Sequence, residues 1–384
     1  MPIQRPRILH ASQMAGTGVV SPSNLNARAQ SSSGNKNLII NGAMNVAQRG
    51  TSQAFAHDGT TNAYLIDRWR FVINSTDELD GTLAQVDEDP LGGGGHALKW
   101  TTGTAESAIA SDEYGYLTQK IEAQNLQHIQ NGNSNAESLT LSFYVKSSIT
   151  GTFSVGLYKP DNTGRIFNKT YTINSANTWE KKSVTFAGDT SGGGINNDTG
   201  EGFWVSWHIF AGSDWKGGGS TSGWTDYANN KWADGQATDA VVTTASATWL
   251  MTQCQLEIGQ NATTFEHETF DVTLKKCFRY YQKSYEYSAD PAGSTGSSHS
   301  IVSNSWGDGN ASFEGQFVGG PMRAAPTTVL RPRGSTTTGE VNSAGTQRAA
   351  SVVHESTNSA GYIAVTSGAA DNWVAYTFES KAEL

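Results

Sequence analysis

Residues 138–147 read SLTLSFYVKS and alternate strictly between apolar and polar positions. The apolar positions are Leu139, Leu141, Phe143 and Val145, and the positions between them are Thr140, Ser142, Tyr144 and Lys146. Successive side chains of a β-strand point to opposite faces of the sheet, so this period of two predicts a half-buried antiparallel strand. The stretch therefore indicates a β protein whose sheets bury one face.

Similar short runs lie on both sides of this stretch and are separated by turn residues. Strands are predicted upstream at Leu38–Val46, Asp67–Ile73, Ala97–Thr101 and Tyr116–Glu122, and downstream at Gly151–Tyr158, Phe167–Ile173, Trp179–Phe186, Gly202–Phe210 and Trp249–Ile258. Glycine runs such as Gly92–Gly95 lie between them, where a positive φ costs little. Many short strands joined by glycine turns predict an antiparallel all-β sandwich rather than an α/β enzyme fold.

One short helix is predicted after the last of these strands. Phe270, Leu274, Cys277 and Phe278 fall at helical spacing, and Asp271 can cap the start. The aromatic strand Arg279–Tyr287 follows, and a Ser/Gly/Pro-rich break separates it from a smaller β domain. The strands predicted in that domain are Ser300–Ser305, Ala311–Val318, Thr327–Arg331, Ala349–His354, Gly361–Thr366 and Trp373–Phe378.

The chain is thus expected to have three parts, which are residues 1–36, 37–287 and 288–384. The first part holds four basic residues and no acidic one, and it is too rich in Ser, Gly, Asn and Gln to build a core. A frayed tail is one interpretation. We favour an extended N-terminal arm that docks onto a partner subunit or a neighbouring copy, with Arg5, Arg7 and Arg28 as its anchoring residues.

The composition excludes several functions. A net charge of −9 argues against a chain that coats nucleic acid. No run of about eighteen apolar residues occurs, so no membrane insertion is expected, and the N-terminus lacks the apolar region of a secretory signal. Two cysteines exclude a disulfide scaffold and a Cys-based zinc module. We expect Cys254 and Cys277 to be buried free thiols that pack among apolar side chains.

Several phrases of the sequence resemble phage and prophage tail-fibre and related virion proteins. They are Asn37–Met44 with Gln48–Gly50, Tyr64–Trp69, Gln253–Gly259 with Ala262–Glu266, Cys277–Tyr281, Pro321–Thr327 and the final Ala382–Leu384. The resemblance implies a jelly-roll sandwich like those of carbohydrate-binding modules, then a small β domain. It also implies virion attachment, recognition of a host-surface polysaccharide and assembly as a homotrimer. Such jelly-rolls often hold a structural calcium ion, but the sequence singles out no ligands for it, and no other cofactor is expected.

The densest aromatic stretch lies between residues 204 and 232. Trp204 and Trp207 are opposite in phase, so one is expected in the core and the other over an edge of the sandwich. Three further indoles lie in a polar, glycine-flanked loop without strand periodicity, where they can stack on sugar rings. The predicted glycan site comprises Trp215, Trp224, Trp232 and Tyr227 with Asp214 and Asp226. The alternative is that these rings staple the loop to the sandwich or fill a subunit interface.

Catalysis and metal binding find little support in the residues. Glu266 and Glu268 flank His267, which on a strand makes a solvated edge, and no metal-binding motif occurs. Glycoside hydrolysis needs two carboxylates about 5–10 Å apart across a cleft. The acidic stretch Asp77, Glu78, Asp80, Asp87, Glu88 and Asp89 ends at Pro90 and is typical of a solvated loop.

These observations favour a non-enzymatic phage virion protein. We expect a tail fibre or receptor-binding appendage that attaches to other virion proteins, such as a tail adaptor or the capsid, through its N-terminal arm. A capsid decoration, cement or head-fibre protein that stabilises the particle is the alternative. A polysaccharide-degrading tailspike is a third interpretation, but no β-helix repeat is visible.

Overall fold

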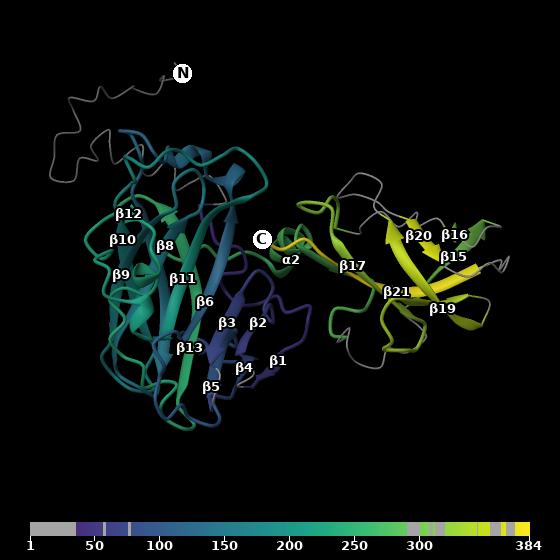
Figure 1. Ribbon diagram of the computed structural model, residues 1–384, viewed down its shortest axis with the longest axis horizontal. Helices are drawn as coiled ribbons and strands as arrows, with labels where there is room; N and C mark the ends of the chain where they lie inside the picture. Colours follow the sequence, from purple (N-terminus) through teal and green to yellow (C-terminus); the bar gives the residue numbers. More distant parts are fainter. Residues whose placement is uncertain are drawn as a thin grey trace, which may run out of the picture. The chain divides into compact units, whose positions relative to one another are not determined.

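The computed structural model describes residues 36–56, 59–75, 78–289, 300–306, 310–311, 319–343, 345–353, 362–365 and 373–384 (Figure 1). The chain divides at residue 36, into Met1–Lys36 and Asn37–Leu384. Arg5, Arg7 and Arg28 lie outside the described residues, so their anchoring role stays a prediction. Asp77 and most of the strand predicted at Ala311–Val318 also lie outside them. The domain boundary at residue 287 likewise remains a prediction.

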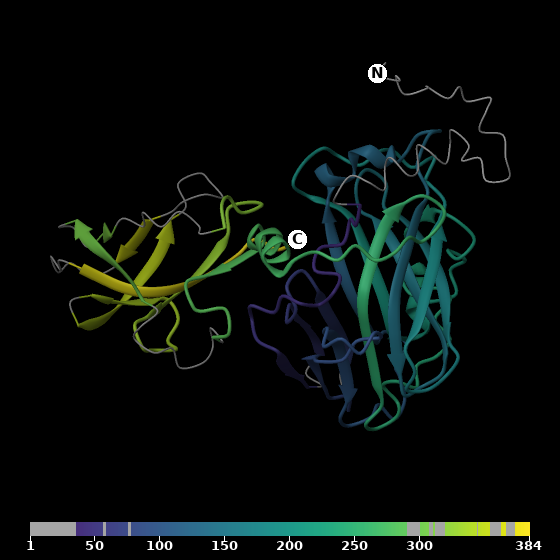
Figure 2. The same ribbon diagram turned by 180° about the vertical axis from the view of Figure 1, so that it is seen from behind.

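Two antiparallel sheets form a jelly-roll sandwich. The six-stranded sheet has the order β1 (Ser52–Phe55), β4 (Gly81–Val86), β5 (Ala97–Thr102), β13 (Thr248–Ile258), β7 (Leu139–Ser147) and β10 (Glu180–Phe186). The seven-stranded sheet has the order β12 (Thr225–Asp226), β9 (Arg165–Ile173), β8 (Gly151–Lys159), β11 (Glu201–Ala211), β6 (Tyr114–Glu122), β3 (Arg70–Ser75) and β2 (Gly59–Ala63). Strands β9, β10 and β11 follow one another in the chain but lie in alternate sheets, and Figure 2 shows the sandwich from behind. The predicted all-β antiparallel fold class is confirmed.

The core of the sandwich lies between these two sheets. Leu139, Leu141, Phe143 and Val145 of β7 are all buried, as their alternation predicts. Phe143 meets Trp207 of the opposite sheet at 5.7 Å between ring centroids, and Phe71 stacks on Trp100 at 5.1 Å. Aromatic contacts of this kind add to the large apolar area that the rings bury. Cys254 is buried in the same core, as expected.

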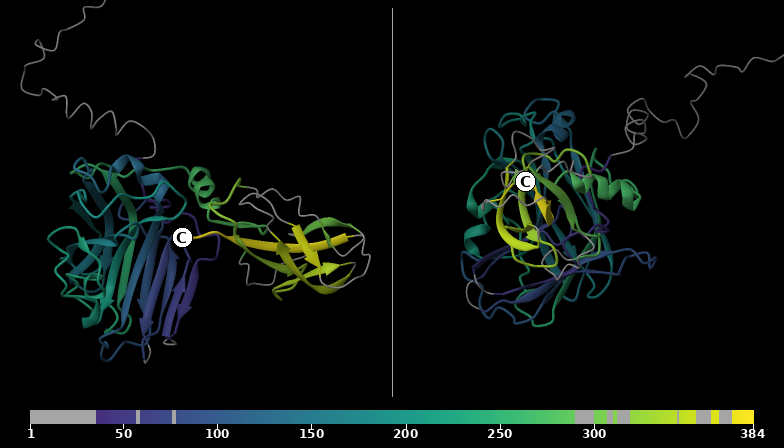
Figure 3. Two further views of the ribbon diagram at one scale, coloured as in Figure 1. Left: turned by 45° about the horizontal axis from the view of Figure 1, so that its top comes forward. Right: turned by 90° about the vertical axis from the view of Figure 1, so that its right-hand side faces the viewer.

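A third antiparallel sheet is built around one long strand, β21 (Trp373–Lys381), drawn in yellow in Figure 3. One edge of β21 pairs with β14 (Tyr281–Lys283) and β15 (Ile301–Trp306), and the other with β17 (Thr327–Pro332) and β18 (Glu340–Ser343). The remaining strands are β16 (Asn310–Ala311), β19 (Thr346–Val353) and β20 (Tyr362–Val365). A small core that includes Leu330, Val341 and Tyr376 supports this sheet.

Helical structure is short among the described residues. The helix α2 spans Phe270–Phe278, and 3₁₀ turns occur at η2 (Ala123–Ile129), η3 (Ser213–Trp215) and η4 (Asn229–Lys231). The helix occurs where the spacing predicts it, and Cys277 is buried on its inner side. Its N-cap is Thr269, so the expectation that Asp271 caps the start is wrong, because the helix already begins at Phe270. Asp271 lies in the first turn, where its carboxylate interacts favourably with the positive end of the helix dipole.

The strand predicted at Leu38–Val46 is a turn, which corrects that expectation. Asn41 and Met44 both have φ near 58°, a left-handed conformation that breaks any strand. The Asn41 side chain donates to the Val46 carbonyl at 2.9 Å and accepts from its amide at 3.0 Å, which closes the turn. A Cβ on Gly42 would lie 2.1 Å from the Cys254 carbonyl oxygen, so glycine lets this turn dock on β13.

Candidate glycan-binding face

The outer face of the seven-stranded sheet presents aromatic and charged side chains in rows. Strand register places Lys120 opposite Trp204, and Trp204 opposite Tyr158. The central row comes next, and from strand to strand it contains Arg70, Thr118, Ser206, Gly156 and Asn168. The row beyond it contains Val72, Tyr116 and His208. Opposed residues on one face of a sheet lie within about 5 Å of each other, so each row is a continuous strip. Thr118, Ser206 and Asn168 of the central row are buried, so other side chains cover this row.

Trp232 lies at the centre of this face. Its indole is only 6% exposed and packs edge-on against Tyr116 at 5.3 Å and against Tyr158, Trp204 and His208 at 5.7 Å each. Burial lowers the pKa of His208 to about 3, so this imidazole is neutral near neutral pH. Trp232 therefore belongs to a second hydrophobic cluster outside the sandwich core.

The segment 212–236, which carries Trp232, is held on the sheet by hydrogen bonds. The Asp234 carboxylate accepts from the Gly217 amide at 2.9 Å, and its carbonyl accepts from the Ser154 hydroxyl of β8 at 2.7 Å. The Asn168 side chain of β9 donates to the Ser220 hydroxyl at 2.7 Å. These bonds fix a glycine-rich segment that has little periodic structure of its own.

Three half-buried rings border Trp232 and remain partly open to solvent. Tyr227 meets Tyr158 at 4.9 Å, and Trp204 meets Tyr158 edge-on at 5.7 Å. Glu201 accepts a hydrogen bond from the Trp204 indole at 2.7 Å and from the Lys120 ammonium at 2.6 Å. Lys120 also lies 4.0 Å from the centroid of the Trp204 ring. Rings with adjacent charged donors and acceptors match the mixed apolar and hydroxyl surface of a sugar.

The predicted site residues divide into two groups. Trp215 lies at the far end of the same cluster, where its ring meets Tyr114 at 4.6 Å and its indole donates to the Asp112 carbonyl. Asp214 is exposed and accepts from the Ser111 hydroxyl at 3.0 Å. The structure thus brings Trp215, Trp232 and Tyr227 together.

Trp224 lies apart from the other predicted rings. It stacks on Phe203 at 5.8 Å and packs against the sandwich core, while its indole donates to the Ala187 carbonyl at 2.6 Å. Asp226 is exposed and pairs with Arg165 at 2.8 Å. Whether these six residues bind glycan stays a prediction, and Trp224 has the contacts expected of a staple.

Several residues of this face were not singled out from the sequence as site residues. They are Arg70, Tyr114, Tyr116, Lys120, Tyr158, Glu201 and His208. Tyr114, Tyr116 and Lys120 occupy alternate positions of β6, and Trp204 and His208 do so on β11. Aromatic residues at the outward positions of adjacent strands are the signal that could have found them.

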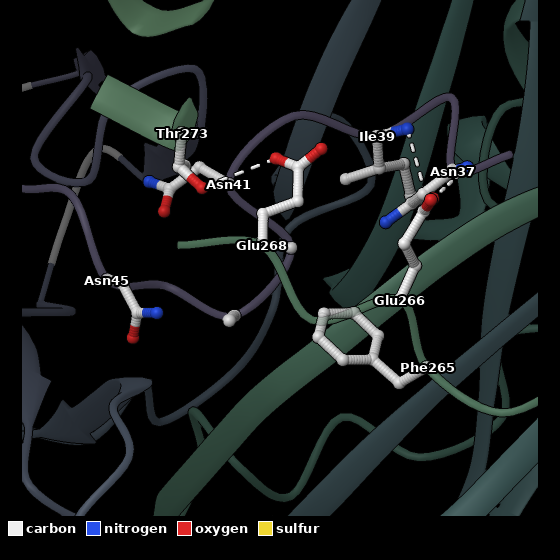
Figure 4. Close-up of a pocket in the computed structure, with 10 residues that line it drawn as sticks. Asn37, Ile39, Asn41, Asn45, Phe265, Glu266, Glu268 and Thr273 are labelled. Atoms are coloured by element: carbon white, nitrogen blue, oxygen red, sulfur yellow. Dashed lines mark hydrogen bonds between the residues drawn. The ribbon is translucent and has the colours of Figure 1, made fainter. Parts of the chain in front are cut away.

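Glu266 and Glu268 line a small polar recess beside α2, shown in Figure 4. Glu266 accepts from the Asn37 amide at 2.9 Å, and Glu268 accepts from the Thr273 hydroxyl at 3.3 Å. Both carboxylates are half-buried, whereas His267 is exposed. The expected solvated strand edge is therefore wrong, because this segment is no strand and its acids bond to the neighbouring turn and helix.

The other acidic candidates bond to nearby loops and strands, since Glu88 pairs with Lys146 of β7 at 2.6 Å. Asp89 accepts from the amides of Leu91 and Gly93, and Asp80 accepts from the Thr104 amide at 2.6 Å. Hydrogen bonds from the amides of this glycine loop lower the pKa of Asp89. Within the described residues no group of three or more His, Cys, Asp or Glu side chains could hold a metal ion. In the same part of the chain, no helix is long and apolar enough to cross a membrane.

No family model matches the chain, and no curated protein matches it in sequence. Among solved structures, it is similar to the enzymatically active domain of bacteriophage CBA120 tailspike protein 4, with 9% identity and a TM-score of 0.30. That match covers 58% of this chain and only 22% of the tailspike chain.

Two further solved structures also match. One is a putative sugar binding protein from Bacteroides thetaiotaomicron, with 14% identity, a TM-score of 0.30 and coverage of 58% of this chain and 100% of the other. The second is a family 11 carbohydrate-binding module of Clostridium thermocellum, solved with a mixed-linked tetrasaccharide. It has 10% identity and a TM-score of 0.26, and the match covers 57% of this chain and 99% of the module.

Proposed function

We propose that this chain is a non-enzymatic phage virion protein, a tail fibre or receptor-binding appendage, whose sandwich binds a host-surface polysaccharide. The observation that carries the glycan-binding part is the aromatic face around Trp232. There, Tyr158, Trp204 and Tyr227 are half-buried and border a surface that also holds Lys120 and Glu201. The resemblance of its sequence phrases to tail-fibre proteins supports the virion part.

The physical argument for a glycan rests on the mixture of groups. A sugar ring has an apolar face that stacks on an indole or phenol ring, and hydroxyls that bond to charged groups at its rim. Trp232 is nearly buried and holds the neighbouring rings in place, so these rings are rigid before a ligand arrives. Rigid groups lose little entropy on binding, which favours affinity from a small contact area.

Binding should be measured by titrating the protein with oligosaccharides released from bacterial surface polysaccharides. We expect Trp204→Ala and Tyr227→Ala each to weaken binding roughly 5- to 15-fold, since one stacked ring contributes about 1–1.5 kcal/mol. Trp179→Ala is the matched control, because Trp179 is a half-buried indole just before β10 of the other sheet. Equal affinities for all four proteins would contradict a binding site on this face.

The virion part of the proposal needs its own test. The arm 1–36 is basic whereas the remaining residues are acidic, so opposite charge would attract the arm to an acidic virion surface. Deleting residues 1–36 should leave the melting temperature almost unchanged and remove the protein from assembled particles. Normal incorporation of the truncated chain would place the anchor elsewhere.

The oligomeric state is tested separately. We expect a homotrimer, so light scattering of the purified protein should give about three times the mass of one chain. A monomer at micromolar concentration would count against a fibre that assembles before it joins the particle. Several copies on one particle would raise a weak single-site affinity by roughly 10²–10⁴ through avidity.

A further inference from the structure

One cation on the aromatic face lacks a counter-charge. Arg70 begins β3 at the end of the central row, and its side chain is half-buried on the outer face. Its guanidinium makes no hydrogen bond or ion pair with any residue that the structure describes. Arginine offers five donors in a planar fork, and leaving all of them without a protein partner in an acidic protein is unusual.

The other charged groups nearby are already paired. Lys120 bonds to Glu201, Arg68 pairs with Glu383, and Glu122 accepts from the Arg279 guanidinium at 2.7 Å. Burial raises the pKa of Tyr64 and Tyr116 and lowers that of Lys120, and the nearby charge of Arg70 acts to lower the pKa of all three groups. Among these charged groups, only Arg70 has no ion-pair partner in the described part of the chain.

The guanidinium lies within reach of the stacking rings. Arg70 is opposite Thr118 on β6, and Thr118 is opposite Ser206 on β11, the strand that carries Trp204. Two strand spacings are about 10 Å, a length that a short oligosaccharide covers. A glycan stacked near Trp204 can thus reach Arg70 by passing over the buried Thr118 and Ser206.

We propose that the glycan bound by this face is anionic, and that Arg70 holds a carboxylate of one of its sugar units by a bidentate, charge-assisted pair. This inference rests on the proposed glycan-binding function and adds the chemical class of the ligand. Arg–carboxylate pairs are shorter, more directional and stronger than neutral hydrogen bonds. An anionic polysaccharide would also be attracted to this unpaired guanidinium despite the net charge of −9.

The test compares matched oligosaccharides on the full-length protein. The probes are pairs of equal length and linkage that differ only at C6, where one member carries a hydroxymethyl group and the other the carboxylate of a uronic acid. Affinities are measured by calorimetry for the wild type, Arg70→Gln, Arg70→Lys and the control Arg333→Gln. Arg333 is exposed and lies just after β17, so its variant removes the same charge from a different surface.

We expect the wild type to prefer the uronic-acid member of at least one pair. Arg70→Gln should weaken that binding roughly 10- to 100-fold and leave neutral binding unchanged, because hydrogen bonds to charged groups contribute about 1.5–3 kcal/mol. Arg70→Lys should recover part of the loss, since lysine keeps the charge without the fork. Melting temperatures of all variants establish that the fold is intact, and added salt should weaken only the anionic binding.

The outcomes separate the two proposals. Binding of neutral sugars without a preference for the acid, or unchanged acid binding by Arg70→Gln, overturns the inference and leaves the glycan-binding function standing. No binding of any glycan by the wild type contradicts the proposed function itself. A loss of acid binding in Arg333→Gln equal to that in Arg70→Gln would show a general charge effect and would also overturn the inference.

Discussion

Arg49 and Glu383 form an ion pair at 2.8 Å although 334 residues separate them in the sequence. Glu383 also pairs with Arg68, and Arg49 pairs with the buried Asp67 at 3.0 Å. The guanidinium of Arg49 lies 3.9 Å from the centroid of the Tyr281 ring. This junction connects the sandwich to the residues that follow β21. The charged side chains that form it are almost fully buried.

The junction gives a physical account of several phrases that resemble tail-fibre proteins. Gln48 and Arg49, then Asp67 and Arg68, then Tyr280 and Tyr281, and finally Glu383 come from four of these phrases and meet in one network. Arg323, from a fifth, donates to the Ala382 carbonyl at 2.9 Å. Five of the six phrases thus meet at this junction, and the proposed glycan-binding face lies outside them.

Removing the charge of Glu383 should destabilise the protein strongly. Glu383→Gln leaves Arg49 and Arg68 with one acidic partner fewer in a buried site, which costs about 3–5 kcal/mol when one member of a buried pair is lost. Urea denaturation at neutral pH measures the loss. The control is Glu88→Gln, which breaks a more exposed pair with Lys146 and should cost less than about 1 kcal/mol. Equal losses in both variants would contradict the role of this junction.

Asp67 should make stability depend on pH in an unusual direction. Burial raises the pKa of its carboxyl from 3.8 to about 6, although Arg49 and Gln48 act to lower it. The folded state thus binds a proton between pH 6 and 4 that the unfolded state does not, so this group stabilises the fold as pH falls. Compared with Asp67→Asn, the wild type should gain on the order of 2–3 kcal/mol between pH 7 and 4.

The measurement for Asp67 is the free energy of unfolding of both proteins at several pH values. Taking the difference between them removes the titration of groups that the substitution leaves unchanged. A difference that is constant from pH 7 to pH 4 would show that the carboxyl keeps an ordinary pKa in the folded protein.

The two loop tryptophans with the most packing should behave as structural residues. Trp232→Ala removes a nearly buried ring from the face cluster and should cost about 3–5 kcal/mol, whereas the half-buried Trp224 should cost about 1–3 kcal/mol. Thermal unfolding and calorimetric sugar binding on both variants distinguish the two interpretations of this loop. A stable Trp224→Ala variant that loses glycan binding would make Trp224 a binding residue after all.

Local pattern predicted the strands well, but it could not place the site. Strand β7 is visible in the sequence because burial of one face imposes a period of two on residues such as Leu141 and Phe143. Trp224 and Trp232 lie in equally polar surroundings in the sequence. What distinguishes them is the part of the sheet on which each one lies. That placement depends on contacts between residues more than fifty positions apart in the sequence, such as Asn168 with Ser220. The left-handed turn at Asn41 was missed because its apolar neighbours have a strand-like pattern.

Gly156 is expected to be essential for the position of the segment 212–236. A Cβ at this position would lie 2.0 Å from the side-chain oxygen of Asn168, which is itself held by donating to Ser220 and to the Lys231 carbonyl. Gly156→Ala should displace Asn168 and break these bonds, at a cost of about 1–3 kcal/mol. Because Trp232 directly follows Lys231, loss of these hydrogen bonds should also make the rings of the aromatic face more mobile.

Hydrogen exchange of the amides in residues 212–236 measures this loosening directly, and sugar affinity should fall together with protection. Gly223→Ala is the matched control in the same segment, since a Cβ there meets no atom within 4 Å. Its exchange rates and affinity should equal those of the wild type. If Gly156→Ala also kept wild-type protection, Asn168 could move without consequence. The hydrogen bonds to Ser220 and Lys231 would then not be what holds the glycan face in place.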